Sequence, residues 1–260
     1  MSSKTLIADE VQQRIDEDDP WYVSPQLEWA NQPFIRPIYA AREQFLREAI
    51  RQSRQPVDSE PLRLLDAGCG DGYWLHRLSD MEGIEFHGLD YNPLRAKRAM
   101  EVAPHAQISL GNLCDFEPQR QFDIVLLNQV IEHVTDDLGL LRHLKKFLKP
   151  HGRLIVGTPN EGALLQQIWL RCRGALKETD HVHFYTERKI RSTIEHAGFR
   201  VTRIMREVFF PGSYRLFYGL TKRKWGFHLL QLGTKLLPGQ CSDYYFVCMH
   251  AGTIGNGGTQ

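Results

Sequence analysis

The sequence has few cysteines and no long apolar run, and each absence excludes a class of protein. Its five cysteines are scattered over 260 residues and form no C-x-x-C pair, which argues against a disulfide framework and a cysteine-rich zinc site. No apolar stretch approaches the roughly 20 residues that a transmembrane helix needs. The first twenty residues are too acidic and too polar for a signal or transit peptide. We therefore expect a cytoplasmic protein whose thiols are reduced.

The sequence also lacks an excess of charge of either sign. Lys plus Arg is 32 and Asp plus Glu is 31, so the formal net charge is +1. No global basic field exists to hold a polyanion, and a nucleic-acid partner is not expected. The length and the ordinary share of hydrophobic residues, 42%, fit one α/β domain with additional segments.

Strand-like and helix-like stretches alternate regularly from Leu62 onward. The expected strands are residues 62–66, 85–90, 106–110, 122–127, 153–157, 199–208 and 243–250. The expected helices are residues 72–81, 93–102, 136–148 and 186–196, and a turn is expected at 149–152. The fourth strand is apolar on both faces, as a central parallel strand should be. The alternation predicts an α/β fold with a Rossmann-like, doubly wound, mostly parallel sheet of seven strands.

Three segments rich in aromatic residues lie outside this alternation and define the expected domain organisation. Residues 1–60 are expected to form an N-terminal extension that is helical from about 38 to 52. The main domain should cover residues 61–251, with insertions at about 160–185 and 209–240, before a flexible tail at 252–260. Additions at the carboxyl ends of strands usually recognise the substrate in such sheets, so we expect these segments to wall a substrate pocket. The alternative is that they shield sheet edges or mediate dimerisation.

The most informative stretch is the glycine loop L-L-D-A-G-C-G-D-G at residues 64–72. A strand runs into a tight turn that a helix follows, and glycine permits positive φ and the close approach of a ligand. The spacing is G-x-G-x-G, which differs from the G-x-G-x-x-G of dinucleotide loops. Asp66 and Asp71 flank the loop, where they would repel a pyrophosphate and attract an ammonium group. S-adenosylmethionine carries such a group and fits this loop better than NAD(P) does.

At these residues the chain resembles the class I S-adenosylmethionine-dependent methyltransferases, whose clearest signatures include the D-A-G-C-G-D-G loop. Further matches are H-G-L-D-Y-N-P at 87–93, E-H-V at 132–134 and L-K-P-H-G-R-L at 148–154, where His151 replaces a glycine. The resemblance covers roughly residues 62–200. It implies S-adenosyl-L-methionine as cofactor and an antiparallel last strand, together with the N-terminal helical segment and cap insertions described above.

The resemblance also implies which residues bind the cofactor. Asp90, at the end of the second strand, would accept both ribose hydroxyls, and Tyr91 would lie beside the adenine. The family's Gly-Asp pair after the third strand, whose acid meets the adenine amino group, is Gly111-Asn112 here. The expected cofactor-binding residues are Asp66, Ala67, Gly68, Cys69, Gly70, Gly72, Asp90, Tyr91, Asn112, Leu113 and Asn128.

Methyl transfer needs a positioned nucleophile and, for a hydroxyl, a base that takes its proton. His133, after the fourth strand and beside Glu132, is the first candidate, and the alternative is a helix-start histidine satisfied by backbone groups. The segment D-H-V-H-F-Y-T at 180–186 resembles a family segment that precedes a helix, in which His181 matches a repeated histidine. The expected catalytic residues are therefore His133, Glu132 and His181.

The same segments also contain potential metal ligands. Alternation would place His181 and His183 on one side of an extended segment. With Glu132 and His133 they could hold a divalent ion, as some quinone-ring O-methyltransferases of the resembled family do. The spacing is not a recognised ligand motif, so no metal ligand is assigned.

Two further stretches carry weaker signals. Residues 158–160, Thr-Pro-Asn, could be a substrate rim or an ordinary turn. Residues 209–237 mix aromatic with cationic residues. For them we favour a helical cap whose aromatic side chains pack on the sheet and whose cations face water. A peripheral membrane contact and a homodimer stay open.

These observations predict an S-adenosylmethionine-dependent methyltransferase that acts on a small-molecule, sugar or glycan, quinone-like or lipid-linked acceptor, at oxygen. The fourth strand ends in N-Q-V-I, without the (N/D)-P-P-[YF] tetrapeptide of many base N-methyltransferases, which argues against a DNA base as acceptor. The alternatives are a protein that binds S-adenosylmethionine without catalysis, and an NAD(P)-dependent oxidoreductase, which the loop spacing disfavours.

Overall fold

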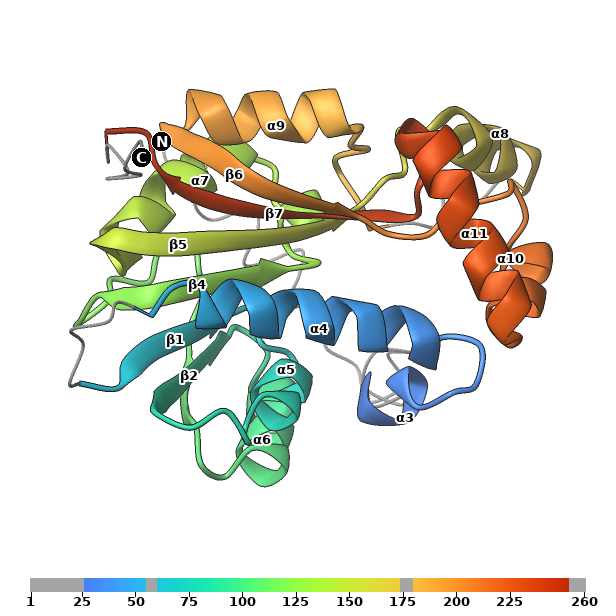
Figure 1. Cartoon of the computed structure of the whole chain (residues 1–260). Helices are drawn as coiled ribbons and strands as arrows, with labels where there is room; N and C mark the ends of the chain where they lie inside the picture. The colour runs from blue at the N-terminus through green and yellow to red at the C-terminus, as the bar shows by residue number, and fades with distance from the viewer. Residues whose placement is uncertain (1–25, 55–59, 174–179, 253–260) are drawn as a thin grey trace, which may run out of the picture.

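A seven-stranded sheet forms the centre of the molecule, with the order β3-β2-β1-β4-β5-β7-β6. The computed structural model describes residues 26–54, 60–173 and 180–252 (Figure 1). The strands are β1 Leu62–Ala67, β2 Ile84–Asp90, β3 Gln107–Leu110, β4 Phe122–Asn128, β5 Leu148–Pro159, β6 Phe199–Arg206 and β7 Asp243–His250.

The direction of the strands confirms the predicted sheet. β1 to β5 pair in parallel, whereas β7 is antiparallel to both β5 and β6. The chain builds the sheet outward from β1 through β2 and β3, and then outward on the other side from β4. In sheets of this type, ligands bind at such a reversal, in the crevice outside the carboxyl ends of the strands that flank it, here β1 and β4.

Helices cover both faces of the sheet (Figure 1). On one face lie α4 Arg36–Arg51, α5 Tyr73–Arg77 and α6 Pro93–Val102, and on the other lie α7 Asp137–Leu144 and α9 Glu187–His196. Local chemistry sets several of these helix starts, because the side chains of Asn92, Asp136 and Thr186 accept hydrogen bonds from backbone N–H groups of the first turn. Each face has its own core, so the sheet is buried on both sides.

Several predicted boundaries are wrong. The helix expected over 72–81 ends at Arg77, because turn-forming Ser79, Asp80 and Gly83 follow, the last with φ of 68°. The helix expected over 136–148 is α-helical only to Leu144, and a 3-10 turn covers 145–147.

The turn expected at 149–152 lies inside β5, where the pairing with β4 shifts from Phe122–Leu148 to Ile124–Arg153. The extra residues form an irregularity within the strand and do not end it.

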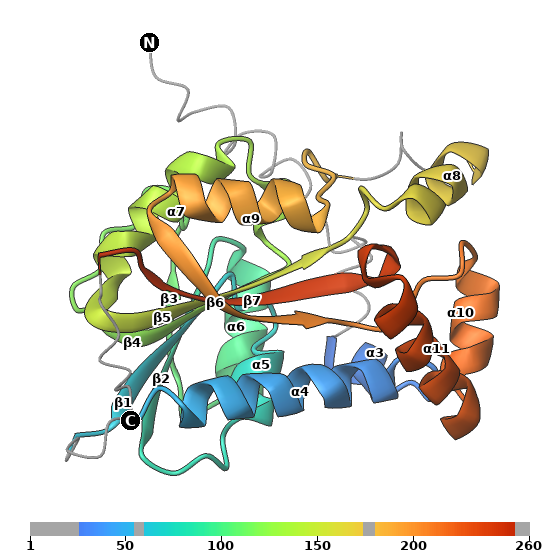
Figure 2. The same ribbon diagram turned by 45° about the horizontal axis from the view of Figure 1, so that its top comes forward.

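The additions outside the alternation meet at one end of the sheet (Figure 2). They form α3 Gln26–Ala30, α8 Leu164–Arg173, α10 Tyr214–Thr221 and α11 Lys224–Leu236, so the helices predicted for the cap at 209–237 are present. Aromatic rings join them: Trp29 lies 6.5 Å from Tyr218, and Trp169 lies 4.6 Å from Tyr214, between ring centroids. Residues 21–25 of the N-terminal aromatic segment lie outside the described residues.

Candidate active site

The glycine loop that follows β1 has the backbone geometry that its sequence predicts. Gly68, Gly70 and Gly72 have φ of 83°, 52° and 77°, a region that disfavours every residue with a Cβ. The N–H groups of Gly68 and Cys69 both donate to the carbonyl of Leu89, which ties the loop to the end of β2. These hydrogen bonds hold the loop as a tight turn against the end of β2.

Asp90 closes the loop from β2. Its side chain is buried, and its carboxylate oxygens accept hydrogen bonds from the N–H of Gly70 at 2.7 Å and the N–H of Asn92 at 2.9 Å. Burial raises the pKa of Asp90, and these hydrogen bonds oppose that shift. Each oxygen has a further lone pair, so the carboxylate fits the ribose hydroxyls expected for it.

The two acids of the loop differ in their partners. Asp66 is 1% exposed, and its Oδ2 is buried without a hydrogen-bond partner. Burial, and then the charge of Asp90, raise the pKa of Asp66 to about 8. An orphaned buried carboxylate oxygen is costly unless a donor or cation meets it, so this atom fits an ammonium group. Asp71, in contrast, is already paired with Arg95 and Arg98, so its attraction of the ligand stays a prediction.

The other residues expected at the cofactor fall into two groups. Tyr91 directly follows β2 and is half exposed. The side-chain oxygen of Asn112 accepts from the N–H of Cys114, and that of Asn128 accepts from the Tyr245 hydroxyl at 2.5 Å. In each amide, the NH₂ group and the second lone pair of the oxygen are the groups that a cofactor could meet. Ala67, Cys69 and Leu113 are buried.

The second half of the crevice follows β4. Gln129 has φ of 55°, which is unusual for a residue other than glycine, and the 3-10 turn Ile131–His133 comes next. Glu132 is fully buried: its Oε2 accepts from the hydroxyl of Thr158 at 3.1 Å, and its Oε1 has no partner. Burial raises the pKa of Glu132 to about 7. Its carbonyl also accepts from the N–H groups of Val182 and His183, so this turn fixes the segment 180–183.

Two histidines meet at this turn, and each has its own carboxylate. The Nδ1 of His133 lies 3.2 Å from Asp180, and that of His181 lies 2.6 Å from Glu161. The two rings are 4.6 Å apart, edge to face. Hydrogen bonding to His133 lowers the pKa of Asp180 to about 2. Burial lowers the pKa of His181, but Glu161 outweighs it and the net shift is upward.

One ligand-like cluster is present in the described part of the chain. Glu132, His133 and His181 each offer one atom within 4.8 Å of the others, and Glu132 has a free oxygen there. This set could hold a divalent ion. The expectation that His183 shares the site is wrong, because its ring turns to the Thr135 carbonyl and to Asp137.

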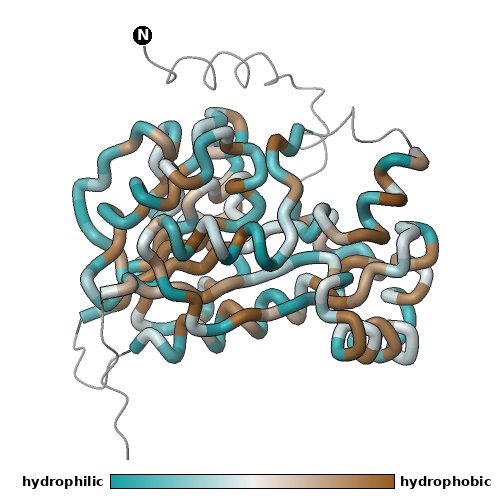
Figure 3. The backbone as a smooth tube through the Cα atoms, turned by 90° about the horizontal axis from the view of Figure 1, so that it is seen from above, coloured by the Kyte–Doolittle hydropathy of each residue, from teal (hydrophilic) through white to brown (hydrophobic). Residues whose placement is uncertain are grey.

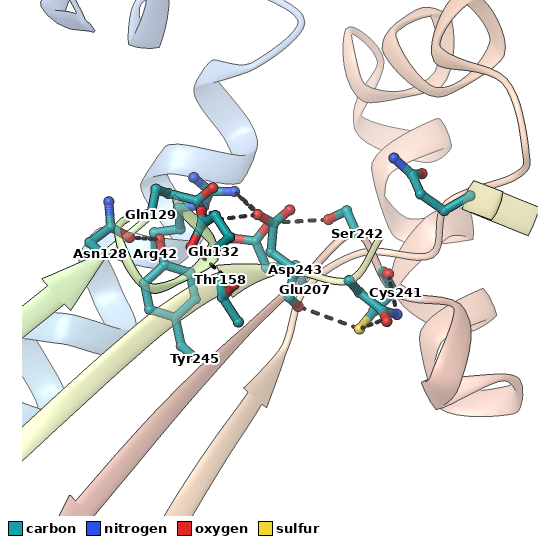
Figure 4. Close-up of polar contacts among 12 residues, drawn as sticks. Arg42, Asn128, Gln129, Glu132, Thr158, Glu207, Cys241, Ser242, Asp243 and Tyr245 are labelled. Carbon is teal, nitrogen blue, oxygen red and sulfur yellow. Dashed lines mark hydrogen bonds and ion pairs between the residues drawn. The ribbon is translucent and has the colours of Figure 1, made fainter. Parts of the chain in front are cut away.

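A buried ionic network lies behind the β4 turn (Figure 4). Arg42 of α4 bonds both oxygens of Glu207 and lies 3.1 Å from Asp243 at the start of β7. The amide of Gln129 donates to the same Asp243 at 3.2 Å, and Ser242 donates to Glu207. The network therefore joins the N-terminal helix, the turn after β4 and the cap.

The two halves of the crevice are in direct contact. A Cβ on Gly68 would overlap the side chain of Val130, which lies directly before the Glu132–His133 turn. A methyltransferase-domain family model matches residues 39–204, well over half of the chain. The chain belongs to the class I S-adenosylmethionine-dependent methyltransferases. The family match excludes the oxidoreductase alternative and makes S-adenosylmethionine the cofactor of this glycine loop.

The chain spans about half or less of the length of the curated relatives it matches. It is 34% identical over 103 residues to a ubiquinone biosynthesis O-methyltransferase of Bradyrhizobium diazoefficiens, covering 38% of this chain and 40% of the relative. A protein of the same name from Rhodopseudomonas palustris is 33% identical over 132 residues, covering 47% and 52%. The magnesium protoporphyrin IX methyltransferase of Synechocystis, solved with bound S-adenosylhomocysteine, has the same fold, with a TM-score of 0.61 at 16% identity over 95% of this chain and all of that chain.

The carboxylate partners of His133 and His181 were not predicted from the sequence. Asp180 stands directly before His181 in the sequence, yet in the structure it serves His133. Glu161, the partner of His181, follows the stretch Thr158–Asn160. In that stretch, Thr158 and Asn160 are buried and form hydrogen bonds within the protein. In the sequence, the one signal for such a partner is a carboxylate next to a candidate histidine. It identifies Asp180, beside His181, and gives no indication of Glu161.

Asp90→Ala in the methyltransferase should weaken the binding of S-adenosylhomocysteine by about 1.5–3 kcal/mol, the usual contribution of hydrogen bonds to a charged group. The ribose would lose its acceptors, and the Gly70 N–H would lose its partner. Titration calorimetry measures the change. Asp80→Ala, which removes an exposed carboxylate on the same face, is the control and should bind like the parent. Equal affinity in Asp90→Ala would show that the ribose lies elsewhere.

The affinity for S-adenosylhomocysteine should rise with pH up to about 8, the pKa of Asp66. An ammonium group favours the ionised carboxylate, so binding below this pKa must first release a proton, at a cost of up to about tenfold in affinity per pH unit. Asp66→Asn should remove this part of the slope. The amino group of the ligand titrates in the same range, so calorimetry of both proteins from about pH 6 to 8 compares their slopes. Identical slopes would contradict the role of Asp66.

Proposed function

We propose that this protein transfers a methyl group from S-adenosylmethionine to a hydroxyl oxygen of a small-molecule acceptor, a ring, sugar or quinone-like compound. The proposal rests on the position of His133. Its Nδ1 faces Asp180, and it follows closely after Val130, whose side chain lies against Gly68 of the glycine loop. The names of the relatives, which are O-methyltransferases, support oxygen as the target.

His133 has the geometry of a general base. Its Nδ1 faces Asp180, which leaves Nε2 as the atom that takes the proton of the acceptor hydroxyl. Because its pKa is about 2, Asp180 is ionised at neutral pH and would stabilise the imidazolium that forms. Asp180 therefore orients the ring and compensates its charge, while Glu132 holds the segment that carries Asp180 and His181.

S-adenosylmethionine carries an electrophilic methyl group on its sulfonium, and the thioether that remains after transfer is a good leaving group. The chain has to hold the cofactor and the acceptor in line. In the proposal, the glycine loop and Asp90 hold the ribose side, and Asp66 meets the ammonium. His181, whose pKa is raised, lies beside His133, where its ring would face the acceptor.

We place acceptor recognition in the cap. Aromatic residues of α3, α8 and α10 meet at the end of the sheet that carries the crevice (Figure 2). Tyr214 is fixed there by the amide of Gln166 at 2.8 Å. Tyr185, in contrast, is fully buried with its hydroxyl on Asp137, so it belongs to the core. An aromatic wall of this kind suits a flat ring or a sugar and excludes water.

The proposal is tested by incubating the protein with methyl-labelled S-adenosylmethionine and a panel of catechols, hydroquinones, sugars and amines. O-methylated products, identified by NMR, are expected from the hydroxyl compounds. Products methylated only at nitrogen or carbon would overturn the assignment of oxygen. Binding of S-adenosylhomocysteine without transfer to any class, with and without added Mg²⁺ or Zn²⁺, would favour the non-catalytic alternative.

A further inference from the structure

Helix α11 has two apolar faces, and only one of them packs against the protein. Gly226, Leu230 and Thr234 are buried against the domain. Trp225, Leu229, Leu232 and Leu236 follow one another at helical spacing along a different face, and each is exposed by 53% or more. Single exposed leucines are common, but a row of four large apolar side chains on one helix marks an interaction surface.

Neighbouring elements extend this surface. Leu216 of α10 and Leu237 after α11 are more than half exposed, as is Leu164 at the start of α8. The three helices gather at the same end of the molecule (Figure 1), and in Figure 3 they carry brown, hydrophobic stretches among paler ones. We call this surface, with the four residues of the α11 row, the cap face.

The charge around the cap face has one sign. Residues 208–242 contain no Asp or Glu and five cations, so the rest of the chain, with 27 cations and 31 acids, has a net charge of −4. All five cations, Arg215, Lys222, Arg223, Lys224 and Lys235, are exposed. None of them forms an ion pair with another described residue of the chain. Lys224, His228 and Lys235 recur at helical spacing and flank the apolar row of α11.

The position of three of these cations points to an anionic partner. Lys222, Arg223 and Lys224 are consecutive at the N-terminus of α11, where the helix dipole is positive and acids are the favourable choice. An external anion at this end would compensate both the cations and the dipole. A second copy of the same face would bring like charges together, which disfavours a two-fold dimer through it.

We propose that the cap face binds peripherally to anionic membrane surfaces, with α11 lying in the plane of the interface. Its apolar row would enter the headgroup region, Trp225 at that level, and its cations would meet lipid phosphates. No described helix is long and apolar enough to span a bilayer. The surface lies at the same end as the proposed acceptor site, but the proposal does not depend on the identity of the acceptor.

The test is sedimentation of the full chain with vesicles of phosphatidylcholine alone and with 30% phosphatidylglycerol. Binding is expected to the anionic vesicles only, and it should fall as the salt concentration rises. Each neutralised cation should lower the partition coefficient about fivefold, so Arg223→Gln with Lys224→Gln should lower it about 25-fold. Leu232→Asp should abolish binding.

Matched controls lie on α6, far from the cap in sequence. Met100→Asp introduces the same acid at an exposed apolar site, and Lys97→Gln removes an exposed cation; both should bind like the parent. Circular dichroism and S-adenosylhomocysteine binding report whether each variant is folded. The proposal is overturned if the parent does not sediment with anionic vesicles at low salt, or if the cap-face variants bind these vesicles as the parent does. Concentration-dependent dimerisation that Leu232→Asp abolishes, without vesicle binding, would assign the face to a second copy.

Discussion

Replacing His133 by alanine is expected to lower the turnover number for methyl transfer by about 10²–10⁴-fold, the usual contribution of a general base. The side chain lies at the carboxyl end of β4 with its Nδ1 on Asp180, and none of its known contacts reaches Asp66 or Asp90. Affinity for S-adenosylhomocysteine should therefore change little. Transfer of labelled methyl groups to an acceptor found by the screen measures the turnover, and calorimetry measures the affinity.

His76→Ala is the control for this variant, because it removes an exposed imidazole from α5 on the other side of the glycine loop. It should keep both turnover and affinity. A loss of less than about tenfold in His133→Ala would leave His133 a structural role, and the base would have to be sought elsewhere in the crevice. A loss of affinity equal to the loss of turnover would show that His133 holds the cofactor.

Arg42→Ala should destabilise the fold by about 3–5 kcal/mol, since removing one partner of a buried ion pair leaves the other uncompensated. The guanidinium faces Glu207 and Asp243 inside the protein and packs on the rings of Tyr39 and Tyr245. Burial raises the pKa of Glu207, and Arg42 opposes that shift. Without Arg42, two neighbouring acids would remain in a poorly solvated site. Urea unfolding of the two proteins measures the difference in free energy.

Lys146→Ala provides the comparison, because its ion pair with Glu117 is exposed on both sides and such pairs contribute under about 1 kcal/mol. If Arg42→Ala loses no more than this control, the network of Arg42, Glu207 and Asp243 does not hold the N-terminal helix against the cap. Since Gln129 bonds Asp243, a folded Arg42→Ala protein should also show reduced turnover, which the transfer assay would detect.

The parts of the protein that local chemistry controls were predictable from the sequence. Helix α6 begins and ends where Pro93 and Val102 predict, because Asn92 caps it and proline suits its first turn. Strand β7 matches its predicted bounds for a similar reason, since its apolar run is continuous between polar neighbours. The glycine loop was also predictable from the sequence, because glycine is the residue that best tolerates the left-handed backbone found at alternate positions 68, 70 and 72.

Partners that come from a distant segment were not predicted. Asp71 flanks the glycine loop, and α6 brings Arg95 and Arg98 to it. His181 and His183 alternate in sequence, yet the turn at Glu132 holds their backbone so that one ring faces His133 and the other Asp137. In each case the sequence pattern was sound and the packing of another element decided the contact.

The sequence by itself determined the sheet, the glycine loop and the family of this protein, because periodicity and turn geometry depend on residues close together in the chain. The tertiary structure alone decided the pairing of charges around the site: Arg42 meets Glu207 across 165 residues, and Gln129 meets Asp243 across 114. Buried charges need partners wherever the fold can supply them, and the fold supplies them only after the sheet and both layers of helices have packed.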